Sequence, residues 1–146
     1  MTDPRHSPAA HTVRLERSFE APPERVYDAW LDPAVLATWM SPVGHAVVSV
    51  DARPGGRFRI VMVGEGRELE HVGRYRELVP GRRLVFTWRS PFTGGDSVVT
   101  VELGRSNRGT ALTLVHEHLP ADQVLPHTGG WVAMLDRLAS VLGGVR

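Results

Sequence analysis

The sequence predicts an α+β protein in which one long C-terminal helix lies across an antiparallel sheet. Seven short segments show the apolar/polar alternation of half-buried strands, and tight turns separate most of them. Two proline-started segments after the first strand are typical of short helices. Residues 127–142 place apolar side chains at helical spacing, which predicts a helix roughly 24 Å long. A lone helix with a broad apolar face must cover a sheet.

The first strand is predicted over residues 13–19, where apolar and polar side chains alternate. Arg17 falls on the apolar side of that alternation, so we expect it to lie near the strand end or to pair with an acid. Two prolines then start a helix that ends near residue 31. Asp32 is expected to cap a second short helix, which Pro42 and Gly44 end.

Five further turn or loop signals divide the next part of the chain. They leave six strands, at residues 43–50, 57–62, 69–76, 83–89, 97–103 and 111–118. No linker or repeat interrupts this pattern, so we expect a single domain over residues 12–146, preceded by a flexible tail at residues 1–11.

The start of the long helix is ambiguous. Proline is unfavourable inside a helix, so the helix either begins near Pro126 or follows a short turn kinked there. Gly129 and Gly130 each cost about 1 kcal/mol inside a helix. We expect them to allow close approach to the sheet or to another helix; the alternative is that they leave room for a ligand.

Composition excludes several classes of function. The 17 basic and 16 acidic residues are scattered and nearly balance, so no nucleic-acid partner is expected. All the basic residues are arginine, which excludes Schiff-base chemistry, and the absence of cysteine excludes thiolate sites. No phosphate-binding or dinucleotide motif is present, so we expect no cofactor. Without an apolar run of 18 residues or a signal-like start, we expect no membrane insertion and a cytoplasmic location.

Seven motifs occur along the chain in a distinctive order and spacing. They are Asp32-Pro33, Trp39, Asp51-x-Arg53-Pro54-Gly55-Gly56-x-Phe58, Gly73-x-Tyr75, Leu84-Val85-Phe86-Thr87-Trp88, Gly109-Thr110-x-Leu112-Thr113-Leu114 and His127-x-x-Gly130-Trp131. Together they resemble the START-like (SRPBCC) superfamily. More narrowly, they resemble the family named for the C-terminal domain of the heat-shock-protein-90 ATPase activator, over residues 12–143. The resemblance implies a helix-grip (START-like, Bet v 1-like) fold. In that fold a curved antiparallel sheet of six or seven strands wraps around the long C-terminal helix. A cavity lies between them, and the two short helices close one end.

This resemblance implies a ligand cavity lined by part of an aromatic and methionine-rich set. The candidate ligand-binding residues are Trp30, Trp39, Met40, Phe58, Ile60, Met62, His71, Tyr75, Phe86, Trp88, His116, Trp131, Met134 and Leu135. For any one of them the alternative is that it packs a dry core. We expect the long helix to be divided, with residues 138–142 sealing a core and its earlier apolar residues forming a pocket wall.

His71 and Tyr75 are the best candidates for catalysis, since both are predicted to point inward from one strand. A histidine pKa near 6.5 can be tuned for proton transfer, although a hydrogen-bonded core histidine is the alternative. His116 and His118 are predicted to share a strand face, but no third ligand is evident, so we expect no metal site. His127 is expected to pack or to bond locally.

The primary hypothesis is therefore binding of a small hydrophobic or amphipathic organic molecule. The alternative is a cyclase- or aromatase-like enzyme that uses the same cavity. A third hypothesis is a chaperone-associated protein. Chaperone stimulation in the resembled family implies a separate N-terminal domain, for which 146 residues leave no room, so a chaperone partner is doubtful. A homodimer through an exposed strand or through residues 90–95 is left open.

Overall fold

The computed structural model describes residues 11–143 of the chain. Its elements are, in order, β1 (Val13–Phe19), α1 (Pro23–Ala29), α2 (Pro33–Trp39), β2 (His45–Val50), β3 (Arg57–Gly64), β4 (Arg67–Val79), β5 (Arg83–Trp88), β6 (Ser97–Ser106), β7 (Gly109–Glu117), η3 (Ala121–Gln123) and α3 (Val124–Gly143). The predicted order of strands and helices is confirmed.

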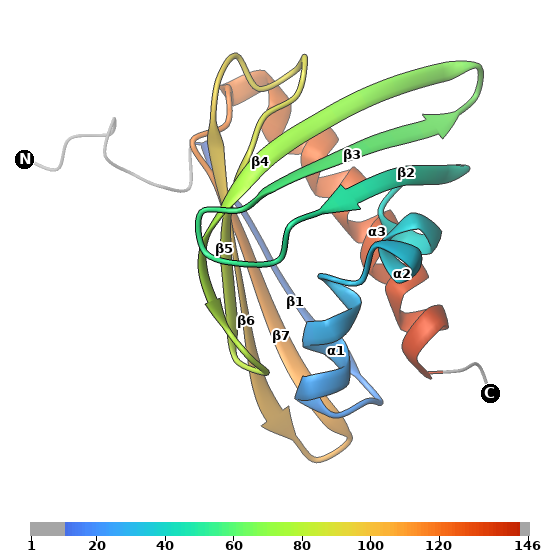
Figure 1. Ribbon diagram of the computed structural model, residues 1–146, viewed down its shortest axis with the longest axis vertical. Coiled ribbons are helices and arrows are strands. Elements are labelled where there is room, and N and C mark those ends of the chain that lie inside the picture. Colours follow the sequence, from blue (N-terminus) through green and yellow to red (C-terminus); the bar gives the residue numbers. More distant parts are fainter. Residues whose placement is uncertain (1–10, 144–146) are drawn as a thin grey trace, which may run out of the picture.

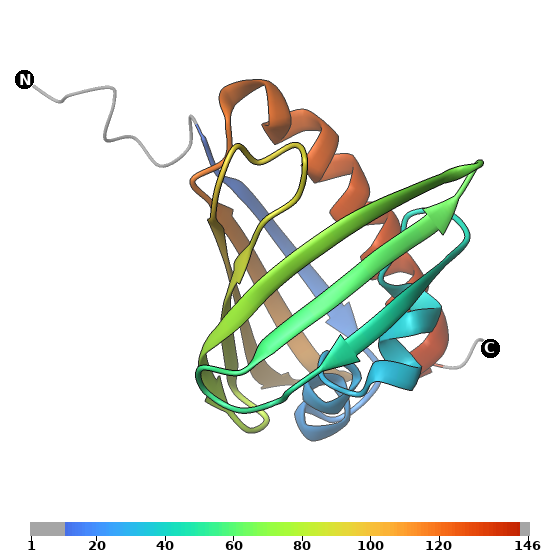
Figure 2. The same cartoon turned by 45° about the horizontal axis from the view of Figure 1, so that its top comes forward.

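The seven strands form one antiparallel sheet in the order β1-β7-β6-β5-β4-β3-β2. The sheet curves around α3, which lies along its concave side (Figure 1). The short helices α1 and α2 lie at one end of this arrangement, and the loop between β5 and β6 reaches the other end beside the start of α3 (Figure 2). This is the predicted helix-grip fold.

Strand β4 passes very close to both of its neighbouring strands at Gly73. Gly73 pairs with Phe58 of β3, and the pairing of β4 with β5 shifts register between Tyr75 and Glu77. A Cβ at Gly73 would lie 2.0 Å from the carbonyl oxygen of Thr87 and 2.5 Å from the Phe58 ring. Only glycine allows this approach.

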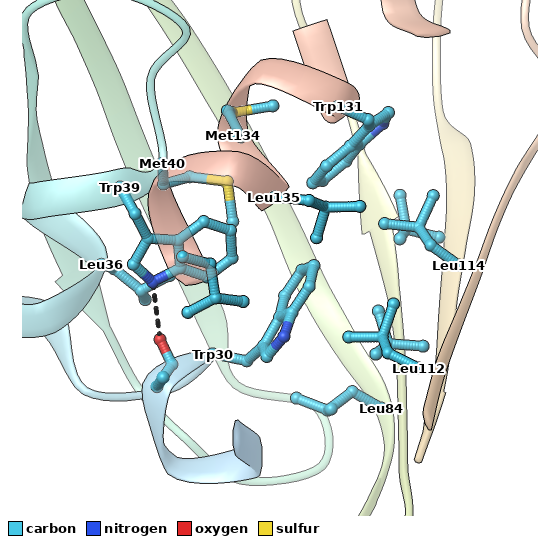
Figure 3. Packing of buried hydrophobic residues seen from close by; sticks show 14 of the residues in the cluster. Trp30, Leu36, Trp39, Met40, Leu84, Leu112, Leu114, Trp131, Met134 and Leu135 are labelled. Atoms are coloured by element: carbon cyan, nitrogen blue, oxygen red, sulfur yellow. Dashed lines mark hydrogen bonds between the residues drawn. The ribbon is translucent and has the colours of Figure 1, made fainter. Parts of the chain in front are cut away.

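The core fills the end of the grip nearest the short helices. Trp30 and Trp39 pack edge to face with ring centroids 4.8 Å apart, and Trp30 also contacts Trp131 at 5.9 Å. The indole N–H of Trp39 donates to the carbonyl oxygen of Ala29 at 3.1 Å, which joins α2 to α1 (Figure 3). Leu84, Leu112 and Leu114 from the sheet complete this cluster. Its rings and branched side chains leave a void of only about 10 Å³.

Two arginines fasten the middle of α3 to its surroundings. Arg17 of β1 forms a salt bridge with Asp136, which confirms that this inward-side arginine pairs with an acid. Arg137 donates to the carbonyl oxygens of Ser41 and Gly44, each at 2.7 Å, and so holds the loop between α2 and β2. The second half of α3 is thus fixed from both sides.

The start of α3 accommodates Pro126, but its two glycines do not have the role that was expected. The helix begins at Val124, so Pro126 lies in the first turn, where its missing N–H costs no intrahelical bond. A Cβ built on Gly129 or Gly130 meets no atom within 4 Å. The expectation that these glycines allow close packing is therefore wrong, because both face open space.

The predicted tail at residues 1–11 lies outside the described residues except for His11. The Nδ1–H of that ring donates to the carbonyl oxygen of Leu119 at 3.0 Å, and its own carbonyl accepts from the Leu119 N–H. Within residues 11–143, none of the helices is long and apolar enough to span a membrane.

Candidate functional site

A cavity of about 360 Å³ lies between the first turns of α3 and strands β3, β4 and β5, at the end of the grip opposite α1. Strand residues form its floor, α3 forms one wall, and two loops contribute Pro42 and Phe92. Its lining residues are Pro42, Met62, Leu69, His71, Trp88, Phe92, Gln123, Pro126, His127, Gly130, Trp131 and Met134. None of these side chains carries a formal charge when the histidines are neutral.

The wall and floor of the cavity are joined by a buried hydrogen-bond chain centred on His116. The indole N–H of Trp131 can only donate, and it donates to Nδ1 of His116 at 3.0 Å. His116 must therefore carry its proton on Nε2, which donates to the Ser97 hydroxyl at 2.8 Å. That hydroxyl donates in turn to the carbonyl oxygen of Trp88 at 2.6 Å. Both nitrogens of His116 are thus used, and the ring is a structural group.

Burial keeps this ring neutral. His116 is fully buried, and burial, with a smaller contribution from the nearby ring of His127, lowers its pKa to about 3. A protonated ring would also have no acceptor at Nδ1, since the Trp131 N–H points at that atom. The hydrogen-bond chain therefore fixes the ring of Trp131 beside that of Trp88, with ring centroids 5.4 Å apart.

His71 and His127 are the two histidines that line the cavity. The Nδ1 of His71 lies 3.1 Å from the carbonyl oxygen of Leu69, and that of His127 lies 2.9 Å from the carbonyl oxygen of Gln123. A carbonyl only accepts, so both Nδ1 atoms carry the proton and both Nε2 atoms are acceptors. Burial lowers the pKa of His71 to about 4 and also lowers the pKa of His127. Both rings are neutral at physiological pH.

Trp88 and Trp30 each hold a buried indole N–H that has no hydrogen-bond partner among the described residues. Trp88 lines the cavity, and its ring packs on His71 with centroids 4.8 Å apart. Trp30 belongs to the closed core. An unpaired buried donor lowers the unfolding free energy by about 1–3 kcal/mol, so the Trp88 N–H destabilises the floor of the cavity.

The structure separates the fourteen candidate ligand-binding residues into two groups. Five line the cavity, namely Met62, His71, Trp88, Trp131 and Met134. Nine pack elsewhere in the interior, namely Trp30, Trp39, Met40, Phe58, Ile60, Tyr75, Phe86, His116 and Leu135.

Tyr75 is not brought into the cavity with His71. Its ring packs against Phe58 with centroids 5.3 Å apart, and burial raises the pKa of its hydroxyl. The register shift just after Tyr75 marks the place where β4 leaves the cavity floor. Tyr75 therefore does not line the cavity that contains His71.

The expected shared face of His116 and His118 is wrong. Strand β7 ends at Glu117, and His118 takes a left-handed conformation with φ of 67°. This conformation turns the chain towards η3 and leaves His118 exposed, while His116 is buried. Within residues 11–143 no group of three metal-ligating side chains comes together.

Several lining residues were not among the candidates. Pro42, Phe92 and Gln123 lie in loops or a single turn, where no periodicity marks the inward direction. Leu69 does share the inward alternation of His71, and Gly130 lies beside Trp131, so sequence position could have indicated these two. His127 bonds locally, as expected, and also lines the cavity.

Comparison with known proteins gives a consistent result. Residues 20–143 match the family described as Activator of Hsp90 ATPase homolog 1-like protein. The crystal structure of protein CV1439 from Chromobacterium violaceum is similar to this chain, with 39% identity, a TM-score of 0.79, and coverage of 92% of this chain and 99% of that protein. DynU16, from the dynemicin biosynthetic locus, is 27% identical with a TM-score of 0.75; the match covers 92% of this chain and 48% of DynU16.

A curated relative is the uncharacterized protein C1711.08 of Schizosaccharomyces pombe. It is 30% identical over 105 residues, which are 70% of this chain and only 28% of that protein. This chain thus spans a little over a quarter of that relative's length. With the family match over most of the chain and the helix-grip fold in place, the chain belongs to the family of Activator of Hsp90 ATPase homolog 1-like proteins within the START-like superfamily.

Proposed function

We propose that the protein binds a small, mostly apolar organic molecule in the cavity beneath the start of α3. The single observation that carries this proposal is the cavity itself, about 360 Å³ of space lined by aromatic, methionine and proline side chains. Ligand sites in proteins are typically concave, apolar and roughly 300–1,000 Å³. The size favours a compact ligand of one to three rings.

The arrangement of the glycines supports the same proposal. Gly130 lines the cavity, and a Cβ there would enter open space. Glycine at this position costs about 1 kcal/mol of helix stability relative to alanine. Packing does not require glycine at this position, because no neighbouring atom is close. Space for a ligand does account for it.

The test uses a neutral fluorescent probe, N-phenyl-1-naphthylamine, whose emission rises in apolar surroundings. We expect the wild type to bind it and Gly130→Leu to bind it at least tenfold more weakly, because the new side chain fills the cavity. Gly129→Leu is the matched control, since Gly129 is equally unobstructed but does not line the cavity. Equal binding by both variants would remove the cavity from consideration. Native mass spectrometry of the freshly purified protein complements this test by detecting a co-purified small molecule.

A second candidate is an enzyme that acts on the ligand. It is favoured by the unprotonated Nε2 of His71 at the cavity floor and by the likeness to DynU16, a protein of a biosynthetic locus. With a pKa of about 4, His71 is a weak proton acceptor that suits positioning better than proton abstraction. A turnover rate unchanged in His71→Phe, once a substrate is identified, would dismiss this candidate.

A further inference from the structure

We propose that the ligand is an uncharged aromatic molecule with a hydroxyl or N–H group that donates a hydrogen bond to the Nε2 atom of His71 or of His127. This inference rests on the proposed function, because it names the chemical class of the molecule bound in the same cavity.

The polar groups of the cavity are predominantly acceptors. The Nδ1–H of each lining histidine is used by a backbone carbonyl, of Leu69 and of Gln123, so each Nε2 offers a lone pair. Within residues 11–143, the only fully buried side-chain polar atoms without a partner are the indole nitrogens of Trp30 and Trp88. The Nε2 atoms of His71 and His127 are not among these enclosed atoms, and both residues line the cavity.

Among residues 11–143, no side chain donates a hydrogen bond to these two acceptors. His116 lies beside His127, with ring centroids 5.3 Å apart, but both of its nitrogens are occupied by Trp131 and Ser97. The Trp88 N–H is enclosed and does not reach an acceptor. Gln123 can either donate or accept, so it does not bias the site. A ligand that brings its own donor completes the hydrogen bonding of the cavity.

The cavity also selects against charge. None of its lining side chains is an arginine or a carboxylate that could pair with an ionic ligand. Protonating His71 or His127 to meet an anion is opposed by their burial, which lowers both pKa values. A carboxylate or an ammonium group would therefore lose its hydration without compensation.

The walls favour an aromatic body. Trp88 and Trp131 present tilted rings 5.4 Å apart, and Phe92 adds a third ring from the loop between β5 and β6. Aromatic rings pack well in such offset and edge arrangements. Met62 and Met134 complete the lining with flexible thioethers, which adapt to the outline of a ring system.

The test compares three naphthalenes by fluorescence titration near pH 7.5. The probes are 2-naphthol, which has a donor; 2-methylnaphthalene, which has a similar shape without one; and 2-naphthoate, which is charged. The proteins are the wild type, His71→Phe, His127→Phe, the double variant, and His45→Phe as a control outside the cavity. Phenylalanine keeps an aromatic ring against Trp88 at position 71 and against His116 at position 127, and it removes the acceptor.

We expect the affinity ratio of 2-naphthol to 2-methylnaphthalene to fall about three- to tenfold in the double variant, the usual effect of one hydrogen bond. The ratio should stay unchanged in His45→Phe, and 2-naphthoate should bind at least tenfold more weakly than 2-naphthol to the wild type. Retained binding of 2-methylnaphthalene shows that a variant is folded.

An unchanged ratio in the double variant would overturn the inference, and so would preferred binding of 2-naphthoate. Either result leaves the proposed function standing if N-phenyl-1-naphthylamine still binds and Gly130→Leu still removes it. If no neutral probe binds the wild type, the proposed function fails together with the inference.

Discussion

The hydrogen bond between Trp131 and His116 should show strong energetic coupling between α3 and the sheet. In His116→Phe, the buried Trp131 N–H loses its acceptor, and in Trp131→Phe the buried Nδ1 of His116 loses its donor. Each orphaned group costs about 1–3 kcal/mol. The double variant has neither orphan. Its loss of unfolding free energy should therefore be about 2–3 kcal/mol smaller than the sum of the two single losses.

The assay is urea unfolding followed by tryptophan fluorescence and circular dichroism at pH 7.5, with all proteins at one concentration. A control cycle pairs His116→Phe with Trp39→Phe, because Trp39 donates to Ala29 and shares no hydrogen-bond partner with His116. The control pair should be additive within about 0.5 kcal/mol. If the His116 and Trp131 losses are equally additive, the hydrogen-bond chain does not carry the energy assigned to it here.

Three further predictions concern stability. Because burial lowers the pKa of His71 to about 4 and of His116 to about 3, against 6.5 for an ordinary histidine, the unfolded chain binds more protons at acidic pH. The unfolding free energy that depends on the two neutral histidines should be fully present above pH 6.5. Below pH 6.5 it should fall, as the pH approaches the lowered pKa values, by about 1.4 kcal/mol per pH unit for each histidine. His71→Phe should make this slope shallower in urea unfolding between pH 7.5 and pH 5, and an unchanged slope would contradict the assignment. Gly73→Ala should lower the melting temperature strongly and cost at least about 3 kcal/mol of unfolding free energy, because the new Cβ would lie 2.0 Å from the Thr87 carbonyl oxygen. The control is Gly104→Ala in β6, where a Cβ meets nothing within 4 Å, and it should be neutral or slightly stabilising. Similar losses of stability at both sites would refute the steric argument. Arg137→Ala should cost about 1–2 kcal/mol in urea unfolding by releasing the carbonyl oxygens of Ser41 and Gly44, whereas a loss below about 0.3 kcal/mol would show that these bonds contribute nothing.

The regular parts of the fold were predictable because periodicity records burial directly. Alternation placed Phe58, Ile60 and Met62 on the inward face of β3, where all three are buried. The helical spacing of Trp131, Leu135 and Leu138 likewise marked the buried face of α3. These signals depend only on which side of an element meets the core, and a single sequence contains that information.

The position of the cavity was harder to predict, because it depends on how elements meet. Of the three α3 residues expected at the pocket wall, Trp131 and Met134 line the cavity. Leu135 is fully buried and does not line it, and the cavity extends towards Pro126 instead. The cavity thus lies nearer the start of α3 than expected. Trp30, the residue that follows the end of α1, packs beside Trp131.

Loop residues were beyond prediction for a different reason. Phe92 lies in a loop that Ser90 and Thr93 hold together through side-chain hydrogen bonds to the backbone. The direction of such a loop follows from turn geometry and from the neighbouring helix. Neither is visible as a period in the sequence.

Asp136 and Arg137, which attach α3 to its neighbours, follow the α3 residues that line the cavity. Ligand specificity and the stability of the fold therefore depend on largely separate positions. Randomising Met62, Leu69, Phe92 and Gly130 should give libraries that keep their fold while changing the preferred ligand, since these side chains take no part in the fastening contacts. The protein is therefore a suitable scaffold for engineered small-molecule receptors. The residues that line the cavity can be substituted, while the contacts at the other end of α3 keep the fold stable.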